Sequence, residues 1–152
     1  MEHYVKKFAD LTTQEFYEIV KERIAVFVVE QNCPYQEVDE IDSQAWHTYF
    51  KDEAGKISAY TRIFEEDGTI HFGRVLVNSE HRKEGLGRKI VQRTMEVIEA
   101  NYPQRPIVIG AQVYLQSFYE SFGFEAISDV YLEDDIPHID MKKSSYSDHD
   151  DR

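Results

Sequence analysis

The chain of 152 residues lacks several features that would place it in well-known classes of protein. Its single cysteine, Cys33, cannot form a disulfide within the chain, and no cluster of Cys and His near it in sequence has the spacing of a metal site. Met1 to Asp10 is polar, and no apolar run approaches the ~20 residues that a membrane-spanning helix requires. We therefore expect a cytoplasmic protein with no metal and no membrane partner. The sequence leaves formation of a homodimer open.

Positive charge is also scarce. The chain has 17 Lys and Arg residues against 29 Asp and Glu residues, and its formal net charge is -12 at pH 7. Proteins that bind nucleic acid along the phosphate backbone need a basic surface, so we expect no nucleic-acid partner. The acidic balance favours encounter with a cationic amine but does not identify one.

Apolar side chains, in contrast, are plentiful. Hydrophobic residues make up 41% of the chain and aromatic residues 13%, which is ample for a packed core in a chain of this length. No internal repeat or linker interrupts residues 1–143, which we predict to form a single domain. Residues 144–152 contain several aspartates and almost no apolar side chain, so we predict an acidic, disordered tail there.

Hydrophobic periodicity and turn residues predict the order of secondary-structure elements. Thr12 and Glu15 have the spacing of a capping box, which begins a helix that we expect to run to about Glu30. The pattern changes to alternation after this helix, which is typical of strands joined by short turns. The other predicted elements are a strand at 4–8, a hairpin at 46–50 and 57–63, a strand at 69–77, a helix from Leu86 that ends before Pro103, a strand at 106–111, a short helix at 115–122, and two late strands at 126–132 and 138–141.

A glycine-containing loop follows the predicted strand at 69–77 and opens a helix. Gly85 and Gly87 let the backbone approach a bulky anion, and the N–H groups of the first helical turn carry the positive end of the helix dipole. The simpler interpretation is that both glycines only shape a tight turn. Four basic residues crowd this turn in an otherwise acidic chain, which favours an anion site. They are Arg82, Lys83, Arg88 and Lys89.

Two nucleotide-binding motifs can be excluded for this loop. A dinucleotide-binding motif requires a third glycine where Ile90 stands, and a P-loop requires Gly-Lys-Ser/Thr, which is absent. The remaining pattern, Arg82-x-x-Gly85-x-Gly87 directly after a hydrophobic strand, resembles the coenzyme A pyrophosphate loop of the GNAT superfamily of N-acetyltransferases. The resemblance implies a set of residues that bind acetyl-CoA at this loop. They are Val75, Leu76, Val77, Arg82, Lys83, Glu84, Gly85, Leu86, Gly87 and Arg88.

A second motif supports this resemblance. Gln112 lies at the end of the strand at 106–111 and precedes Tyr119, the first residue of a Tyr-x-x-x-Gly-Phe pattern, by seven residues. By itself Tyr119 would be interpreted as a core aromatic residue beside Phe118 and Phe122. Both motifs occur in the order and at the distance that GNAT proteins have. The chain is therefore identified as a member of this superfamily, with Gln112 and Tyr119 as further acetyl-CoA contacts.

A finer resemblance, to the ElaA-like branch of GNAT proteins, covers nearly the whole chain. Members of this branch are mostly predicted acetyltransferases without an assigned physiological substrate. The chain departs from the branch at Lys83, where glycine is common, at Ser79, where proline is common, and at Asp135, where glycine is common. The matching residues are 28–35, Asp39, Asp42, His47, 73–75, 111–112 and 136–141.

The resemblance implies a fold and a reaction. The fold is α/β, with a mixed, mostly antiparallel sheet that is flanked by helices and splayed between the strands at 69–77 and 106–111, and acyl-CoA lies in the splay. In the reaction an amine attacks the thioester directly, Tyr119 supplies a proton or a hydrogen bond to the sulfur, and backbone N–H groups around Val77 polarise the carbonyl. The alternative is a GNAT module that binds CoA or a partner without turnover.

The general base and the acceptor are less defined by the sequence. The segment at 30–42 holds five carboxylates with Tyr35 among them, and it would either attract a protonated amine or form a solvated acidic loop. Two of the candidate bases, Glu30 and His138, belong to the ElaA-like segments. The candidates are Glu30, His47, His71 and His138, any of which could instead be structural or replaced by a water relay.

Overall fold

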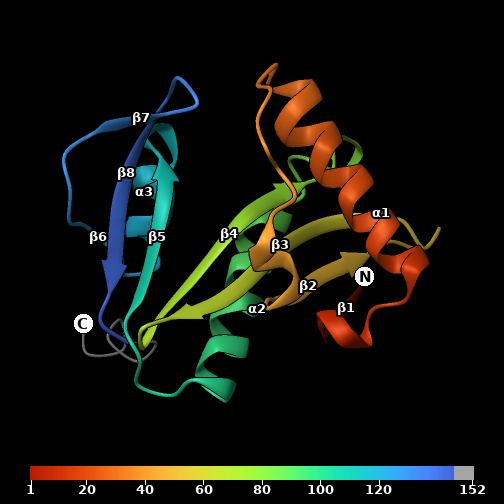
Figure 1. Cartoon of the computed structure of the whole chain (residues 1–152), viewed down its shortest axis with the longest axis horizontal. Helices are drawn as coiled ribbons and strands as arrows, with labels where there is room; N and C mark the ends of the chain where they lie inside the picture. The colour runs from red at the N-terminus through yellow and green to blue at the C-terminus, as the bar shows by residue number, and fades with distance from the viewer. Residues whose placement is uncertain (146–152) are drawn as a thin grey trace. The chain divides into compact units, whose positions relative to one another are not determined.

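A computed structural model of the chain describes residues 1–145, and residues 146–152 of the predicted tail lie outside the described residues. The strands are β1 (Glu2–Lys7), β2 (Trp46–Lys51), β3 (Ile57–Glu66), β4 (Thr69–Val77), β5 (Ile107–Gln112), β6 (Glu125–Ala126), β7 (Tyr131–Glu133) and β8 (Ile136–Lys143). The α-helices are α1 (Thr13–Ile24), α2 (Leu86–Asn101) and α3 (Gln116–Glu120) (Figure 1). Shorter helical segments lie at Phe8–Asp10, Ala25–Glu30, Glu40–Ser43, Ser79–His81 and Val113–Leu115.

The strands form one eight-stranded sheet in the order β1-β2-β3-β4-β5-β8-β6, and β7 pairs with β8. The pairs β1–β2, β2–β3, β5–β8, β6–β8 and β7–β8 are antiparallel, whereas β4 and β5 are parallel. The predicted mixed, mostly antiparallel sheet is therefore confirmed. Residue contacts divide the chain into two compact units, one of residues 1–64 and 74–94 and the other of residues 65–73 with the chain from residue 95 onward.

In the first unit, α1 covers one face of the strands and the first half of α2 covers the other. Thr12 caps α1 by accepting a hydrogen bond from the Glu15 backbone N–H, and the Glu15 side chain accepts one from the Thr12 N–H, so the predicted capping box is confirmed. Alternation along β3 places Tyr60 in the core beneath α1, while the Thr61 hydroxyl lies 2.7 Å from the Thr94 hydroxyl of α2. The core beneath α1 consists of Ile19, Val26, Phe27, Tyr49, Ile57, Tyr60 and Leu76.

The helix that begins at Thr13 changes geometry before it ends. The sequence predicts one helix to about Glu30, but the α-helix ends at Ile24 and continues as a π-helix from Ala25 to Glu30. Wider winding is consistent with burial of the adjacent Val26 and Phe27 side chains in the core. Glu30 therefore lies at the end of a π-helical segment.

In the second unit, β5 and β8 form the longest ladder and α3 packs against one of their faces. The parallel ladder between β4 and β5 contains only the pairs Ile70 with Ile107 and His71 with Val108, although both strands are longer than this. Arg74 in β4 has a positive φ of 52°, which interrupts the regular strand soon after the ladder stops. Figure 1 shows α3 on the far side of β5 and β8.

The prediction of one continuous strand at 126–132 is wrong. The structure has two short strands there, β6 and β7, and the residues between them leave the ladder. The Ser128 hydroxyl accepts a hydrogen bond from the Asp140 N–H at 2.9 Å, and so replaces a backbone carbonyl as the partner of β8. Local hydrogen bonding by serine competes with strand pairing in this way.

The sequence leads us to expect neither a membrane-spanning helix nor a metal site, and both features can be looked for in residues 1–145. Among residues 1–145 no helix is long and apolar enough to cross a membrane. The same part of the chain has no group of three or more His, Cys, Asp or Glu residues that could hold a metal ion.

Candidate functional site

The candidate acetyl-CoA loop begins at Asn78, directly after β4. The Asn78 backbone N–H donates to the Ser58 carbonyl at 2.8 Å, and its side-chain amide donates to Glu22 Oε1 at 2.6 Å. Its side-chain oxygen accepts from the Glu80 N–H, which begins a 3-10 turn. Buried Asn78 therefore anchors the loop to β3 and α1. Our sequence reasoning missed this residue, although an Asx side chain at the start of a turn is a recognisable signal.

The two loop glycines differ in what their backbones require. Gly85 has a φ of +76°, in the left-handed region that favours glycine. Gly87 does not have a positive φ, and a Cβ atom built there would meet only Val77 Cγ2, at the ordinary distance of 3.8 Å. The fold thus needs glycine at position 85 but not at position 87. Absence of a side chain at Gly87 leaves space for a ligand at the first turn of α2.

Lys83 stands where glycine is common in the ElaA-like branch, and its backbone has a strained conformation. Its φ is 74°, which costs a residue with a Cβ atom roughly 1 kcal/mol or more. The side chain is exposed and adds a positive charge to the loop.

The first turn of α2 favours an anion electrostatically. α2 has 16 residues and no acidic residue in its first turn, so the positive end of its dipole is not neutralised there. The loop carboxylate of Glu84 instead faces His81, whose Nδ1 lies 3.2 Å from Glu84 Oε1 and whose Nε2 lies 3.0 Å from Asp52 Oδ2. Hydrogen bonds to Asp52 and Glu84 raise the pKa of His81.

Arg82 connects the loop to a predicted base. Arg82 Nη1 lies 2.6 Å from Glu30 Oε1, and Arg82 Nε donates to the Val77 carbonyl at 3.2 Å. Both side chains of the ion pair are almost half exposed. The Arg82 guanidinium thus occupies the Glu30 carboxylate. Glu30 is therefore better placed to hold Arg82 than to act as a base.

Tyr119 of α3 is 4% exposed and packs against Phe72 and Phe124. Burial raises the pKa of Tyr119, so the hydroxyl keeps its proton at neutral pH. Within residues 1–145 this hydroxyl forms no hydrogen bond. Tyr119 thus presents an unused O–H donor, which is what a proton donor to a leaving thiolate requires.

The register of β5 and β8 assigns their side chains to two faces. Ile109 and Ala111 on β5 alternate with Gly110 and Gln112, and each pairs directly with a β8 residue of the same face. Lys143, which shares a face with Ile139 and Met141, donates to the Phe122 carbonyl just after α3, so this buried face is the one that α3 covers. Four residues of the opposite face concern the candidate site. They are Gly110, Gln112, His138 and Asp140.

His138 therefore lies beside Gln112 on the face opposite α3. Its Nδ1 lies 2.7 Å from the Ile136 carbonyl, and because a carbonyl oxygen only accepts, the neutral ring carries its hydrogen on Nδ1. The lone pair is then on Nε2, which lies 3.6 Å from Glu133 Oε2. His138 can accept a proton at Nε2.

Of the other two histidines, His47 is the one that the structure argues against as a base. His47 is fully buried, accepts a hydrogen bond from the Tyr60 hydroxyl at Nδ1 and donates from Nε2 to the Asp42 carbonyl. Burial lowers the pKa of His47, and both of its nitrogens are occupied. The Nδ1 of His71 donates to the Val108 carbonyl at 3.0 Å, which attaches this ring to β5.

The acidic segment at 30–42 does not form the predicted cation site. Arg23 binds Glu37 at 2.8 Å and Asp42 at 2.6 Å, and Arg62 binds Asp39 at 2.7 Å. Arg74 also binds Glu37, at 2.8 Å. Three guanidinium groups therefore face three carboxylates, and the cluster has no net charge. The carboxylates of Glu37, Asp39 and Asp42 are therefore not free to attract an amine, because arginines distant in sequence neutralise them. We refer to these residues as the arginine cluster: Arg23, Arg62, Arg74, Glu37, Asp39 and Asp42.

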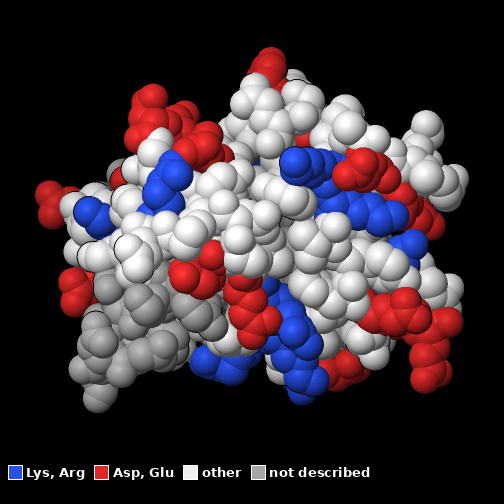
Figure 2. Space-filling model, turned by 90° about the horizontal axis from the view of Figure 1, so that it is seen from below, with Lys and Arg blue, Asp and Glu red and all other residues white. Residues whose placement is uncertain are grey.

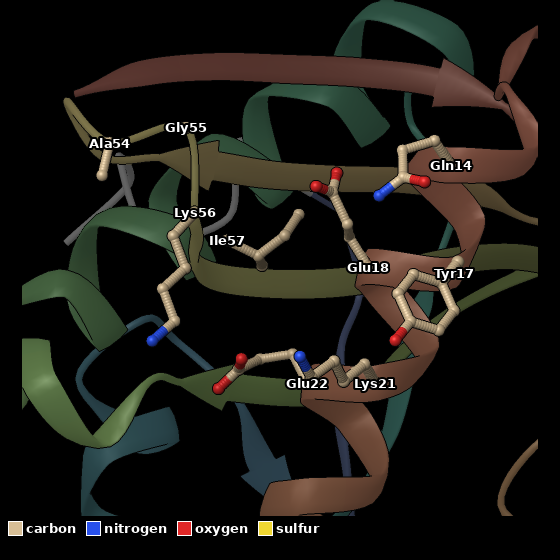
Figure 3. A pocket seen from close by; sticks show the side chains of 9 residues that line it. All are labelled: Gln14, Tyr17, Glu18, Lys21, Glu22, Ala54, Gly55, Lys56 and Ile57. Atoms are coloured by element: carbon tan, nitrogen blue, oxygen red, sulfur yellow. The ribbon is translucent and has the colours of Figure 1, made fainter.

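A pocket of about 330 Å³ lies between α1 and the turn that joins β2 to β3 (Figure 3). None of the residues predicted from the motifs lines it. Two carboxylates, Glu18 and Glu22, and two ammonium groups, Lys21 and Lys56, belong to its wall, so the pocket has no net charge that would select an ionic ligand. Figure 3 shows the Glu22 and Lys56 side chains at one end of this wall, and both are held by loop residues, Glu22 by Asn78 and Lys56 by Glu80.

Charged side chains of both signs are mixed on the surface. On the face shown in Figure 2, Lys and Arg side chains lie next to Asp and Glu side chains. This face therefore does not present a continuous basic surface of the kind that tracks a phosphate backbone.

Comparison with known proteins identifies the family. A profile described as "Acetyltransferase (GNAT) domain" matches residues 9–145. Protein ElaA of Escherichia coli is 38% identical over 139 residues, which are 89% of this chain and 91% of ElaA. The crystal structure of E. coli ElaA has a TM-score of 0.90 at 37% identity and covers 94% of this chain and 99% of that chain. The resemblance to the ElaA-like branch is therefore confirmed.

Two further structures share the fold. An acyl-CoA N-acyltransferase from Pseudomonas aeruginosa has a TM-score of 0.90 at 39% identity, over 94% of this chain and 99% of that one. An aminoglycoside 6'-N-acetyltransferase complexed with coenzyme A has a TM-score of 0.70 at 13% identity, over 93% of this chain and 96% of that one. The second of these, at 13% identity, shows a shared fold, and the matching family profile shows that the chain belongs to the GNAT acetyltransferase family.

Proposed function

We propose that this protein transfers the acetyl group of acetyl-CoA to a primary amine, of a small molecule or a peptide, by direct attack of the amine on the thioester. The observation that carries the proposal is the loop before α2. Glycine at position 87 serves no conformational need, the first turn of α2 has no acidic residue, and Arg82 and Lys83 add positive charge. A pyrophosphate would fit these features through backbone N–H groups and the helix dipole.

In the proposed reaction, His138, the backbone N–H groups around Val77 and Tyr119 each have one role. The ammonium of the acceptor loses a proton to His138 Nε2, and the neutral amine attacks the thioester carbonyl. Backbone N–H groups around Val77 stabilise the oxyanion that forms. When the carbon–sulfur bond breaks, the thiolate takes the proton of the Tyr119 hydroxyl, and the proton that the new amide nitrogen loses restores that hydroxyl. In this scheme the base and the acid act on different groups, His138 on the acceptor ammonium and Tyr119 on the leaving thiolate.

The binding half of the proposal is tested by calorimetry with acetyl-CoA. Gly87→Asp should abolish saturable binding, because its carboxylate would occupy the position of a phosphate. Position 87 is preferable to position 85 for this test, because a side chain at Gly85 would also strain the backbone. Gln92→Glu, which adds the same charge further along α2, is the matched control and should bind as the parent does. Equal affinity in Gly87→Asp would contradict the loop assignment.

The catalytic half is tested by release of CoA against a panel of amines and peptides. Tyr119→Phe keeps the ring and removes only the hydroxyl, so we expect kcat to fall by about 10²- to 10⁴-fold with little change in acetyl-CoA affinity. An unchanged kcat would remove Tyr119 from the mechanism. Binding of acetyl-CoA without release of CoA for every acceptor would favour a non-catalytic CoA-binding module.

A further inference from the structure

We propose that Tyr131, held by Asp140 above Gly110, is a positioning residue that fixes the His138 ring for proton transfer. The inference rests on the proposed function, in which His138 is the base. Tyr131 and Asp140 are in neither of the motifs that identified the site. Their role depends on contacts that three strands bring together.

Tyr131 forms a layer over the His138 ring. The two residues pair directly across β7 and β8, so their side chains share a face of the sheet. The ring centroids lie 6.0 Å apart and the ring planes differ by 23°, which is a stacked arrangement. The hydrogen bond from Nδ1 to the Ile136 carbonyl limits rotation of the imidazole at its edge. The stack with Tyr131 limits it on one face of the ring.

The Tyr131 hydroxyl is fixed in turn by Asp140. It donates to Asp140 Oδ1 at 2.6 Å, and burial together with this hydrogen bond raises the pKa of Tyr131, so the donor keeps its proton at neutral pH. The backbone of Asp140 is itself held, because its N–H donates to Ser128 and its carbonyl accepts from Ile127. Ser128 thus holds Asp140, Asp140 holds the Tyr131 hydroxyl, and the Tyr131 ring contacts the ring of His138.

Gly110 makes this arrangement possible. It pairs with Asp140 on the same face of β5 and β8, directly beneath the hydrogen bond. A Cβ atom at position 110 would lie 3.2 Å from the Tyr131 hydroxyl and 3.7 Å from Asp140 Oδ1. The first distance is tighter than nearly all real contacts of a Cβ atom, so a side chain here would displace the tyrosine. Glycine at position 110 is explained by the space that Tyr131 needs.

The hydrogen bonds of this arrangement do not use Nε2 of His138. Glu133 Oε2 is 3.6 Å away and that side chain is largely exposed, so a substrate ammonium can replace it. Neither Tyr131 nor Asp140 contacts Nε2. The pair acts through the orientation of the ring, and not by exchanging protons with the substrate.

The experiment compares Tyr131→Leu, which loses both stack and hydrogen bond, with Tyr131→Phe, which keeps the stack. The first readout is the ¹⁵N NMR signal of the His138 ring, where we expect the Nδ1–H tautomer to dominate in the parent and to be averaged with the other tautomer in Tyr131→Leu. The second is steady-state kinetics. We expect kcat to fall by about tenfold or more in Tyr131→Leu and by less in Tyr131→Phe, with acetyl-CoA affinity within about twofold of the parent.

Further variants separate positioning from stability. Asp140→Asn retains an acceptor for the tyrosine hydroxyl and should restore most of the activity that Asp140→Ala loses, whereas Gly110→Ala should shift the Tyr131 hydroxyl and lower kcat by less than Tyr131→Leu does. Tyr17→Leu removes a half-exposed tyrosine elsewhere and should change neither readout. Circular dichroism of each variant establishes that it is folded.

The outcomes distinguish this inference from the proposed function. If His138→Gln keeps the parent kcat, the base assignment itself is wrong and the positioning role falls with it. If His138→Gln is impaired but Tyr131→Leu leaves the tautomer signal unchanged, Tyr131 does not fix the ring. If the tautomer signal changes and kcat does not, the orientation is irrelevant to the reaction, and the inference is overturned in that case too.

Discussion

The arginine cluster makes a quantitative prediction about stability. Asp42 is 2% exposed, and its carboxylate accepts hydrogen bonds from Arg23 at 2.6 and 3.1 Å and from Arg62 at 3.1 Å. Asp42→Asn keeps the shape of the side chain but leaves three guanidinium groups facing two carboxylates. Breaking a buried ion pair by removing one charge costs about 3–5 kcal/mol, which is a large share of a total stability of about 5–15 kcal/mol. We expect a loss of stability in that range.

The same change should depend on pH with a definite sign. Burial would raise the pKa of Asp42, but the hydrogen bonds and charge of Arg23 outweigh burial and hold the pKa below its ordinary value of 3.8. A group whose pKa is lower in the folded state contributes stability above its unfolded pKa and loses it as the pH falls through the folded value. The difference between parent and Asp42→Asn should therefore be full at pH 7 and should shrink below about pH 4.

Urea unfolding followed by circular dichroism, at pH 7 and at a series of pH values down to 3, measures this difference. Glu40→Gln is the matched control, because Glu40 belongs to the same segment but is exposed, and we expect its effect to stay within about 0.5 kcal/mol. A loss below about 1 kcal/mol in Asp42→Asn at pH 7, or a loss that does not depend on pH, would refute the argument that Asp42 is a buried charged partner of two arginines.

Two other predictions concern the loop. Glu30→Gln removes the carboxylate that competes for Arg82, so calorimetry should show acetyl-CoA binding that is unchanged or severalfold tighter, and stability should change by less than about 1 kcal/mol because the pair is half exposed; weaker binding would contradict it. His81→Gln should destabilise the protein more at pH 6 than at pH 9 in thermal unfolding, because the pKa of His81 is raised by Asp52 and Glu84 and its stabilisation is lost as the pH rises through the folded value. A difference that grows with pH would contradict this sign.

The sequence by itself determined most of the local structure. The capping box at Thr12, the strand at 69–77 and the start of α2 at Leu86 follow from patterns of neighbouring residues, and the structure has them at the predicted positions. The motifs around Gly87 and Tyr119 identified the family for the same reason, because their residues lie close together in the chain. Short-range spacing is enough where one element supplies all the groups involved.

Tertiary structure alone decided the roles of residues that depend on distant partners. The carboxylates at 37–42 look like a solvated acidic loop until Arg23, Arg62 and Arg74 are placed against them. Those arginines come from a helix and two strands, and no spacing in the sequence shows that they meet.

The candidate base shows the same limit. The lone pair on Nε2 of His138, the stack with Tyr131 and the contact with Asp140 depend on the register of β7 and β8, and the space above Gly110 depends on that of β5. A shift of one residue in either register would turn these side chains to the other face of the sheet. Register is set by the packing of the α3 face and by the Ser128 hydrogen bond, which are properties of the folded chain.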